Sequence, residues 1–100
     1  MYAICFDMVV SELEKHYGTP YNKAYDEIKK TLKTFGFQWQ QGSTYFGVKD
    51  DINAVTCVVA VQELTRKYIW FAPSVRDIRM LRVEEDNDLM PAIKMVYQQK

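Results

Sequence analysis

The chain begins with the stretch MYAICFDMVV at residues 1–10, an apolar run in which Asp7 is the one charged residue. A short apolar run that ends where the pattern changes is typical of a buried β-strand. Because side chains alternate along a strand, Asp7 should share a face with Cys5 and point away from Phe6. A strand that is apolar on both faces is normally covered on both.

A carboxylate in such a strand has to be paired with a cation, hydrated in a cleft or changed in its protonation. One interpretation is that Asp7 caps the helix that follows, because Asp is a common N-cap residue. The other is that Asp7 is a catalytic or metal-binding carboxylate at the end of the strand. The residue types alone favour neither interpretation over the other.

The composition predicts a single folded domain over residues 1–100. A chain of this length can bury a core, and a hydrophobic fraction of 48% argues against disorder. Lys and Arg number 13, and so do Asp and Glu, which leaves no net charge. Such a balance argues against a tight, stoichiometric nucleic-acid binder, but it leaves room for a local basic cluster that contacts a transient substrate.

The two cysteines, Cys5 and Cys57, lie in apolar runs, so we expect buried free thiols rather than a disulfide. Neither has a second Cys or a His at metal-ligand spacing, so no zinc site is expected. No apolar run is long enough to cross a bilayer, and the first residues lack the basic region of a signal peptide. We therefore expect a cytoplasmic protein with no membrane partner.

Two helices should follow the first strand. The first, within residues 8–17, should stop at Gly18, because Gly favours the position after a helix. Thr19 as N-cap and Pro20 at the first helical position should then open the second helix. That helix should end at Gly36, with its apolar residues on one side and its lysines mostly on the other, as a solvated surface.

Residues 37–48 alternate between apolar and polar side chains, and Gln41-Gly42 in their middle predicts the turn of a β-hairpin. Residues 54–68 are ambiguous, because their valines favour a strand whereas their length and an apolar helical stripe favour a helix. We predict a helix there, with Asn53 as a possible cap.

The last third of the chain should form a loop at residues 69–73, a strand at 75–83, an acidic turn at 84–88 and a short helix at 91–97. The complete βαββαβ order predicts an α+β, ferredoxin-like domain, a four-stranded antiparallel sheet with helices on one face. Because the first strand is apolar on both faces, we expect a homodimer that covers the other face.

The predicted last strand lies within SVRDIRMLR at residues 74–82, which holds three arginines beside Asp77. Arginine forms bidentate contacts to phosphate oxygens. In a regular strand Arg76 and Arg82 share one face and Arg79 takes the other, so only a bulge would let them line one surface. The alternative, which the residue types favour, is an internal network of Arg76, Asp77 and Arg79 that orders the strand.

Two further polar residues have two interpretations each. Ser43, just after the hairpin glycine, either stabilises the turn or contacts a phosphate or hydroxyl near Asp7. His16 is the only histidine, so any histidine mechanism within one chain would have to use it. Its place at the end of a predicted helix favours a surface role that complements the helix dipole.

Several blocks of this sequence together resemble the virulence-associated protein D (VapD) family, over essentially the whole chain. The blocks are MYAICFD at 1–7, WQQGS at 39–43, YFG at 45–47, NAVTC at 53–57, SVRDIR at 74–79 and DLMPAIK at 88–94. The resemblance implies a modified ferredoxin-like fold, similar to that of the small dimeric nucleases of CRISPR adaptation systems, which carry an Asp at the end of strand 1.

The resemblance also implies an endoribonuclease that acts as the toxin of a toxin–antitoxin system, with a small antitoxin protein as partner. It implies that Asp7 is functional, with Ser43 and Asp77 as matching secondary positions. Two subunits would bring their Asp7 carboxylates together as a base–acid pair or as a seat for Mg²⁺.

In that enzyme, Arg76 or Arg79 would hold the scissile phosphate and Ser43 would position it. The competing hypothesis is a non-catalytic, dimeric module of the same fold that binds RNA or protein. In that module Asp7 is structural and the arginines are the binding residues. The balanced charge and the absence of a histidine cluster motivate this alternative.

Overall fold

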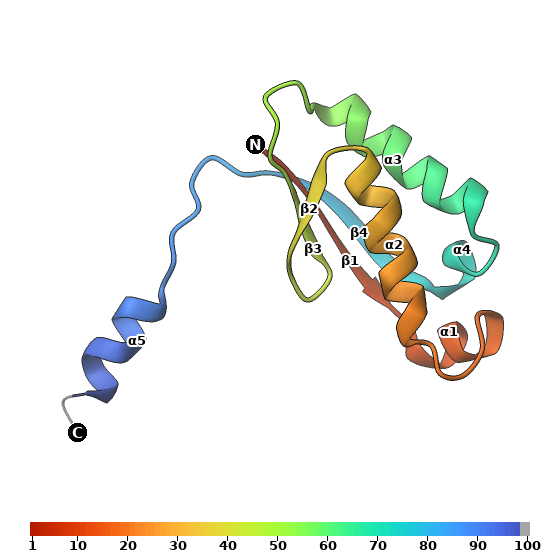
Figure 1. Ribbon diagram of the computed structural model, residues 1–100, viewed down its shortest axis with the longest axis horizontal. Coiled ribbons are helices and arrows are strands. Elements are labelled where there is room, and N and C mark those ends of the chain that lie inside the picture. The colour runs from red at the N-terminus through yellow and green to blue at the C-terminus, as the bar shows by residue number, and fades with distance from the viewer. Residues whose placement is uncertain (99–100) are drawn as a thin grey trace.

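The computed structural model describes residues 1–98 of the chain (Figure 1). Its elements are β1 (Tyr2–Met8), α1 (Val10–His16), α2 (Asn22–Thr34), β2 (Phe37–Gln41), β3 (Thr44–Gly47), α3 (Ala54–Lys67), α4 (Phe71–Ser74), β4 (Val75–Arg82) and α5 (Met90–Tyr97). The four strands form one antiparallel sheet in the order β2-β3-β1-β4. This α+β arrangement confirms the predicted ferredoxin-like fold.

Strand β1 is an inner strand of the sheet, and its side chains point alternately to the two faces. Ile4, Phe6 and Met8 are buried in the core whereas Asp7 is exposed, as the alternation predicted for β1 requires, although Ala3 on the Asp7 face is also buried. Helices pack on the Ile4 side of the sheet and complete the core. Their fully buried apolar residues are Leu13, Ala24, Ile28, Leu32, Ala60 and Leu64.

Helix α3 confirms the helix predicted at residues 54–68. The Oδ1 atom of Asn53 accepts hydrogen bonds from the backbone N–H groups of Val55 and Thr56, at 2.9 and 3.1 Å. The hydroxyl oxygen of Thr56 accepts one from the N–H of Asn53 at 3.2 Å, which completes a capping box. These local bonds and the burial of Cys57 and Leu64 override the strand propensity of the valines.

The predicted start of α2 is wrong. The helix begins at Asn22, and its N-cap Tyr21 makes no side-chain capping bond, so Thr19 and Pro20 lie in the preceding turn. The reason is tertiary packing, because the Tyr21 ring packs against the core and meets the Tyr25 ring edge-on at 6.2 Å. A good local capping pair is therefore bypassed in favour of burying an aromatic ring.

The proposal that Asp7 caps a helix is also wrong. The N-cap of α1 is Val9, whose own N–H donates to the carbonyl of Ser74 at 2.8 Å, and no side chain caps this helix. The loop predicted at residues 69–73 contains part of a short helix, α4, because Trp70 and Phe71 are buried in the core. The Ser74 hydroxyl stabilises this turn by donating to the Trp70 carbonyl at 2.7 Å.

The C-terminal segment leaves the body of the domain after β4 and ends in α5, which stands apart from the sheet in Figure 1. The predicted terminal helix is confirmed and starts at Met90. None of its residues is buried, although it is rich in large apolar side chains. Among the helices of residues 1–98, none combines the length and apolar character that a membrane span requires.

Candidate active site

Asp7 lies near the end of β1, on the face of the sheet opposite the core. Its partner in the strand register is Asp77 of β4, so the two carboxylates lie side by side on neighbouring strands. The Asp7 side chain is 63% exposed and the Asp77 side chain 49% exposed. Two acidic groups therefore meet at one end of a strand pair, in a place that a solvated ligand can reach.

A β-bulge lies directly at this point. Asp7 pairs with Asp77, but the next residue, Met8, pairs with Val75, so Arg76 is the extra residue on β4. The Nη1 atom of Arg76 lies 3.7 Å from Oδ2 of Asp7. The bulge thus supplies the irregularity without which Arg76 and Arg79 could not serve one surface.

The predicted internal network exists in part. The Nε–H of Arg79 donates to both carboxylate oxygens of Asp77, at 3.0 Å each. This hydrogen bond and the charge of Asp77 raise the pKa of Arg79, which keeps the guanidinium charged. Arg76 pairs with Asp7 rather than with Asp77, so the site consists of two neighbouring carboxylate–guanidinium pairs.

Two such pairs can perform two kinds of chemistry. An exposed carboxylate can take a proton from a hydroxyl group, and the guanidinium beside it can hold a phosphate oxygen. The Asp7–Arg76 pair is long and exposed, so it contributes little to stability and opens at little cost. The geometry is therefore that of an open surface pair rather than one that stabilises the fold.

The Mg²⁺ seat predicted at Asp7 would need donors beyond those that a single chain clusters there. Within residues 1–98 there is no group of three or more His, Cys, Asp or Glu side chains placed to hold a metal. Mg²⁺ commonly binds through one or two carboxylates and water, and in one chain Asp7 and Asp77 each lie beside an arginine. The magnesium seat stays a prediction, and no step of the chemistry below depends on it.

Ser43 lies on the hairpin turn next to β1. Its carbonyl accepts a hydrogen bond from the N–H of Phe6, the residue before Asp7, at 3.1 Å. Its side chain lines a groove of about 440 Å³ between α2 and the β2–β3 hairpin, which we call the hairpin groove. The lining residues are Tyr25, Asp26, Lys29, Trp39, Gly42, Ser43 and Tyr45.

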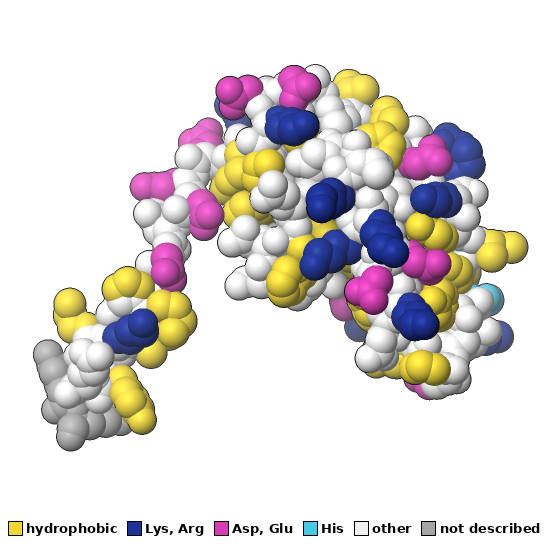
Figure 2. Space-filling model, viewed as in Figure 1, with side chains coloured by type: hydrophobic (Ala, Val, Ile, Leu, Met, Phe, Trp, Pro, Cys, Tyr) yellow, Lys and Arg dark blue, Asp and Glu magenta, His cyan; other side chains and the backbone are white. Residues whose placement is uncertain are grey.

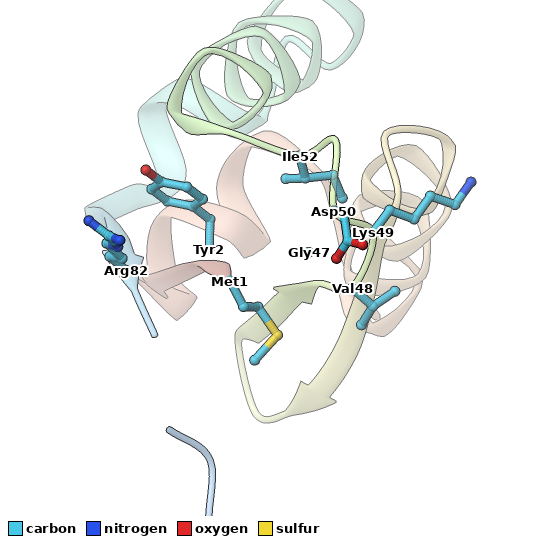
Figure 3. Close-up of a pocket in the computed structure, with 8 residues that line it drawn as sticks. All are labelled: Met1, Tyr2, Gly47, Val48, Lys49, Asp50, Ile52 and Arg82. Carbon is cyan, nitrogen blue, oxygen red and sulfur yellow. The ribbon is translucent and has the colours of Figure 1, made fainter. Parts of the chain in front are cut away.

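The remaining predicted candidates lie elsewhere. Arg82 pairs in register with Tyr2 at the opposite end of β1 and lines a separate pocket of about 340 Å³ (Figure 3). His16 lies on the surface of α1, where its Nε2 atom is 3.2 Å from a Glu12 carboxylate oxygen. His16 is thus exposed at the end of α1, and its role stays a prediction.

One contact in the hairpin groove was not anticipated. The ammonium group of Lys29 lies 5.1 Å from the ring centroid of Trp39, although the lysines of α2 were predicted to be plain solvated surface. The pairing depends on how α2 packs against β2, which no local pattern reveals. The only feature of the sequence that hinted at this contact was Trp39 itself, an aromatic residue in the middle of a predicted hairpin strand.

Comparison with known proteins gives a consistent match along the chain. The family model described as CRISPR associated protein Cas2 matches residues 1–90. An Endoribonuclease VapD homolog of Helicobacter pylori is 50% identical over 96 residues, which is 96% of this chain and 99% of that protein. Endoribonuclease VapD 2 of Riemerella anatipestifer is 49% identical over 93% of this chain and 99% of its own length. Endoribonuclease VapD of Dichelobacter nodosus is 50% identical, with coverages of 94% and 98%.

Proposed function

The chain belongs to the VapD endoribonucleases and also matches the Cas2 family model, and from this membership we propose that it cleaves internal phosphodiester bonds of RNA. The observation that carries the proposal to particular residues is the exposed Asp7 carboxylate, 3.7 Å from Arg76 at the β-bulge. Bulges are frequent beside active sites because they re-aim a side chain. Here the re-aimed side chain is the cation that an RNA phosphate needs.

Asp7 acts as the general base in this proposal. Its carboxylate takes the proton of a ribose 2′-hydroxyl, the 2′-oxygen forms a bond to phosphorus, and the bond from phosphorus to the 5′-oxygen breaks. The Asp7 of a second subunit, carrying a proton, donates it to the leaving 5′-oxygen. The products are a 2′,3′-cyclic phosphate and a 5′-hydroxyl, and the two carboxylates exchange roles.

Arg76 and Arg79 stabilise the charge that grows on the phosphate. Arg76 is the closer of the two to Asp7, and Arg79 lies on the neighbouring pair with Asp77. Asp77 therefore serves as a positioning residue that orients Arg79. Ser43, held next to β1 through its backbone, positions the nucleotide that enters the hairpin groove.

We further propose that the active form is a homodimer built on the uncovered face of the sheet. On the same face as Asp7, the register places the buried Ala3 of β1 between the half-buried Phe46 of β3 and the exposed Leu81 of β4, and the latter two form an apolar patch. A two-fold axis through this patch would bring the two β1 strands together and carry both Asp7 residues along. The exposed apolar side chains of α5 offer further surface that a second copy could cover. We propose that residues 1–100, α5 included, form one domain.

We also propose a toxin–antitoxin role in the cytoplasm, with a small protein as the antitoxin. A nuclease with an open active site has to be restrained in the cell that makes it, and the simplest restraint covers Asp7 or the strand from Arg76 to Arg82. Hydrogen exchange of a co-purified complex tests this, since unchanged protection at both places would contradict it. The competing function is that of a non-catalytic dimer, which would bind RNA or protein through the same arginines but would not cleave RNA.

Cleavage of a short single-stranded RNA by the purified protein, compared with Asp7→Asn, tests the main proposal. We expect loss of cleavage in this variant and a 2′,3′-cyclic phosphate among the parent's products. Asp51→Asn is the matched control, because Asp51 is an exposed carboxylate outside the site. Equal cleavage by Asp7→Asn would refute the assignment, and no cleavage by the parent, with or without Mg²⁺, would favour the binding module.

A further inference from the structure

We propose that the hairpin groove binds one unpaired nucleobase of the RNA substrate, stacked on the indole ring of Trp39. This inference rests on the RNA-cleaving function proposed above and assigns that function a binding subsite outside the Asp7–Arg76 pair. Proteins that bind single-stranded RNA commonly combine an exposed aromatic face with nearby cations that follow the backbone. The groove offers both features.

The indole of Trp39 is presented in a fixed orientation. Trp39 lies on β2, the edge strand of the sheet, and is 50% exposed. Its Nε1–H donates to the carbonyl of Gly42 at 2.8 Å, so the ring's only polar group is already satisfied within the turn. A ring held in this way offers a flat apolar face and loses little freedom when a base stacks on it.

Lys29 occupies the place that the base would take. Its ammonium group lies over the Trp39 ring, 5.1 Å from the ring centroid, and both residues line the hairpin groove. A cation–π contact at an exposed ring is weak, whereas base stacking is stronger. A base can therefore displace the ammonium group, and the freed Lys29 can contact the phosphate of the same nucleotide.

The charges around the groove give the nucleotide a direction. In Figure 2, Lys and Arg side chains gather over α2, so the backbone phosphates should run along this helix. The lysines of α2 are Lys23, Lys29, Lys30 and Lys33. Asp26, a lining residue of the groove, repels phosphate but can accept hydrogen bonds from base N–H groups. This local basic surface also explains how a chain with no net charge can attract RNA.

The groove and the Asp7–Arg76 pair lie on opposite faces of the sheet, but both lie near the end of β1 that carries Asp7. The Ser43 carbonyl on the groove accepts from Phe6, the residue directly before Asp7. Tyr25, another lining residue, has its pKa raised by burial, and the charges of Tyr21 and Asp7 add to this rise. An RNA strand that passes around this end of the sheet could therefore place one base in the groove and a neighbouring phosphate at Asp7 and Arg76.

Trp39 fluorescence tests the stacking directly. The chain has two tryptophans, and Trp70 is buried, so a Trp70→Phe background isolates the Trp39 emission. Adding Asp7→Asn prevents cleavage, and the ligand is a 2′-O-methyl RNA of about ten nucleotides, a length that fits known single-strand sites. We expect saturable quenching, and about tenfold weaker binding after Lys29→Ala, from the phosphate and stacking contributions. Lys15→Ala on α1 is the matched control and should bind as tightly as its parent.

The second measurement compares KM and kcat for RNA cleavage in the protein that retains Asp7. Trp39→Ala should raise KM about tenfold and leave kcat within about twofold, because it removes a stacking contact and no reacting group. Trp39→Phe, which keeps an aromatic face, should restore most of the loss and shows that the effect is not one of folding. RNA that binds and is cleaved without quenching Trp39 would overturn the subsite but keep the proposed function. Quenching without any cleavage by the parent would support the subsite and refute the nuclease.

Discussion

The two faces of the sheet differ in what they contribute, although the same strand supplies both. On the helix-covered face of β1, Ile4 is 1% exposed and packs in the core. One residue after the buried Phe6, on the opposite face, Asp7 is 63% exposed and pairs with Arg76. Residues on one face of β1 therefore stabilise the fold, whereas Asp7 on the other face is available for the proposed reaction. Substitutions on the two faces should affect stability and cleavage separately.

The largest effect on stability should come from the covered face. Ile4→Ala removes a fully buried side chain, and we expect the free energy of unfolding to fall by about 2–5 kcal/mol, because a cavity remains in the core. Val55→Ala on α3, where the valine is exposed, is the control and should change stability by less than about 0.5 kcal/mol. Urea unfolding measures both. A similar loss for the two variants would mean that burial does not separate the faces.

On the uncovered face, Asp7→Asn should lower RNA cleavage by about 100-fold or more, because general-base catalysis is typically worth that much. Its stability should change by less than about 1 kcal/mol, since the lost ion pair is exposed and 3.7 Å long. Initial rates of cleavage check the first expectation, and thermal unfolding of the same preparation checks the second. A marked fall in stability would assign Asp7 a structural role, and the two faces would then not differ in their contribution to stability.

A charge in the apolar patch of the uncovered face should weaken the proposed dimer. Leu81→Asp replaces a side chain that is 47% exposed in one chain, and the lost burial should weaken association by about tenfold or more. Sedimentation at micromolar concentration measures the change. Val55→Asp adds the same charge on α3 and should leave association unchanged. A monomeric parent that still cleaves RNA would remove both the interface and the shared-carboxylate mechanism.

The smallest effect should appear only at high pH, on the covered face. Burial, with a smaller effect of Asp26, raises the pKa of the Tyr45 phenol to about 12. An unfolded chain loses this proton near pH 10, before the folded one does, so Tyr45's contribution to stability is intact below about pH 10 and lost as pH rises through about 12. Tyr45→Phe should flatten the fall in stability over this range. Tyr97→Phe, at an exposed tyrosine of α5, should not.

Local chemistry was sufficient to predict most elements. The alternation of residues 1–10, the glycine of the hairpin turn and the cap at Asn53 each act within a few residues, so the strand, the hairpin and α3 were predicted where the structure has them. Prediction failed where distant packing won over a local signal. The bypassed Thr19–Pro20 pair and the helix at Phe71 both reflect aromatic rings drawn into the core.

The candidate site divides in the same way. The residue types and the period of two along β1 were enough to predict that Asp7 lies opposite the core. Only the tertiary structure decided their partners, because pairing between β1 and β4 depends on a register that one inserted residue, Arg76, shifts. The contact of Lys29 with Trp39 likewise requires α2 to lie against β2, and only the folded chain shows that no residue of α5 is buried. Contacts between segments far apart in the chain follow from how surfaces fit together, and a local period carries no information about that fit.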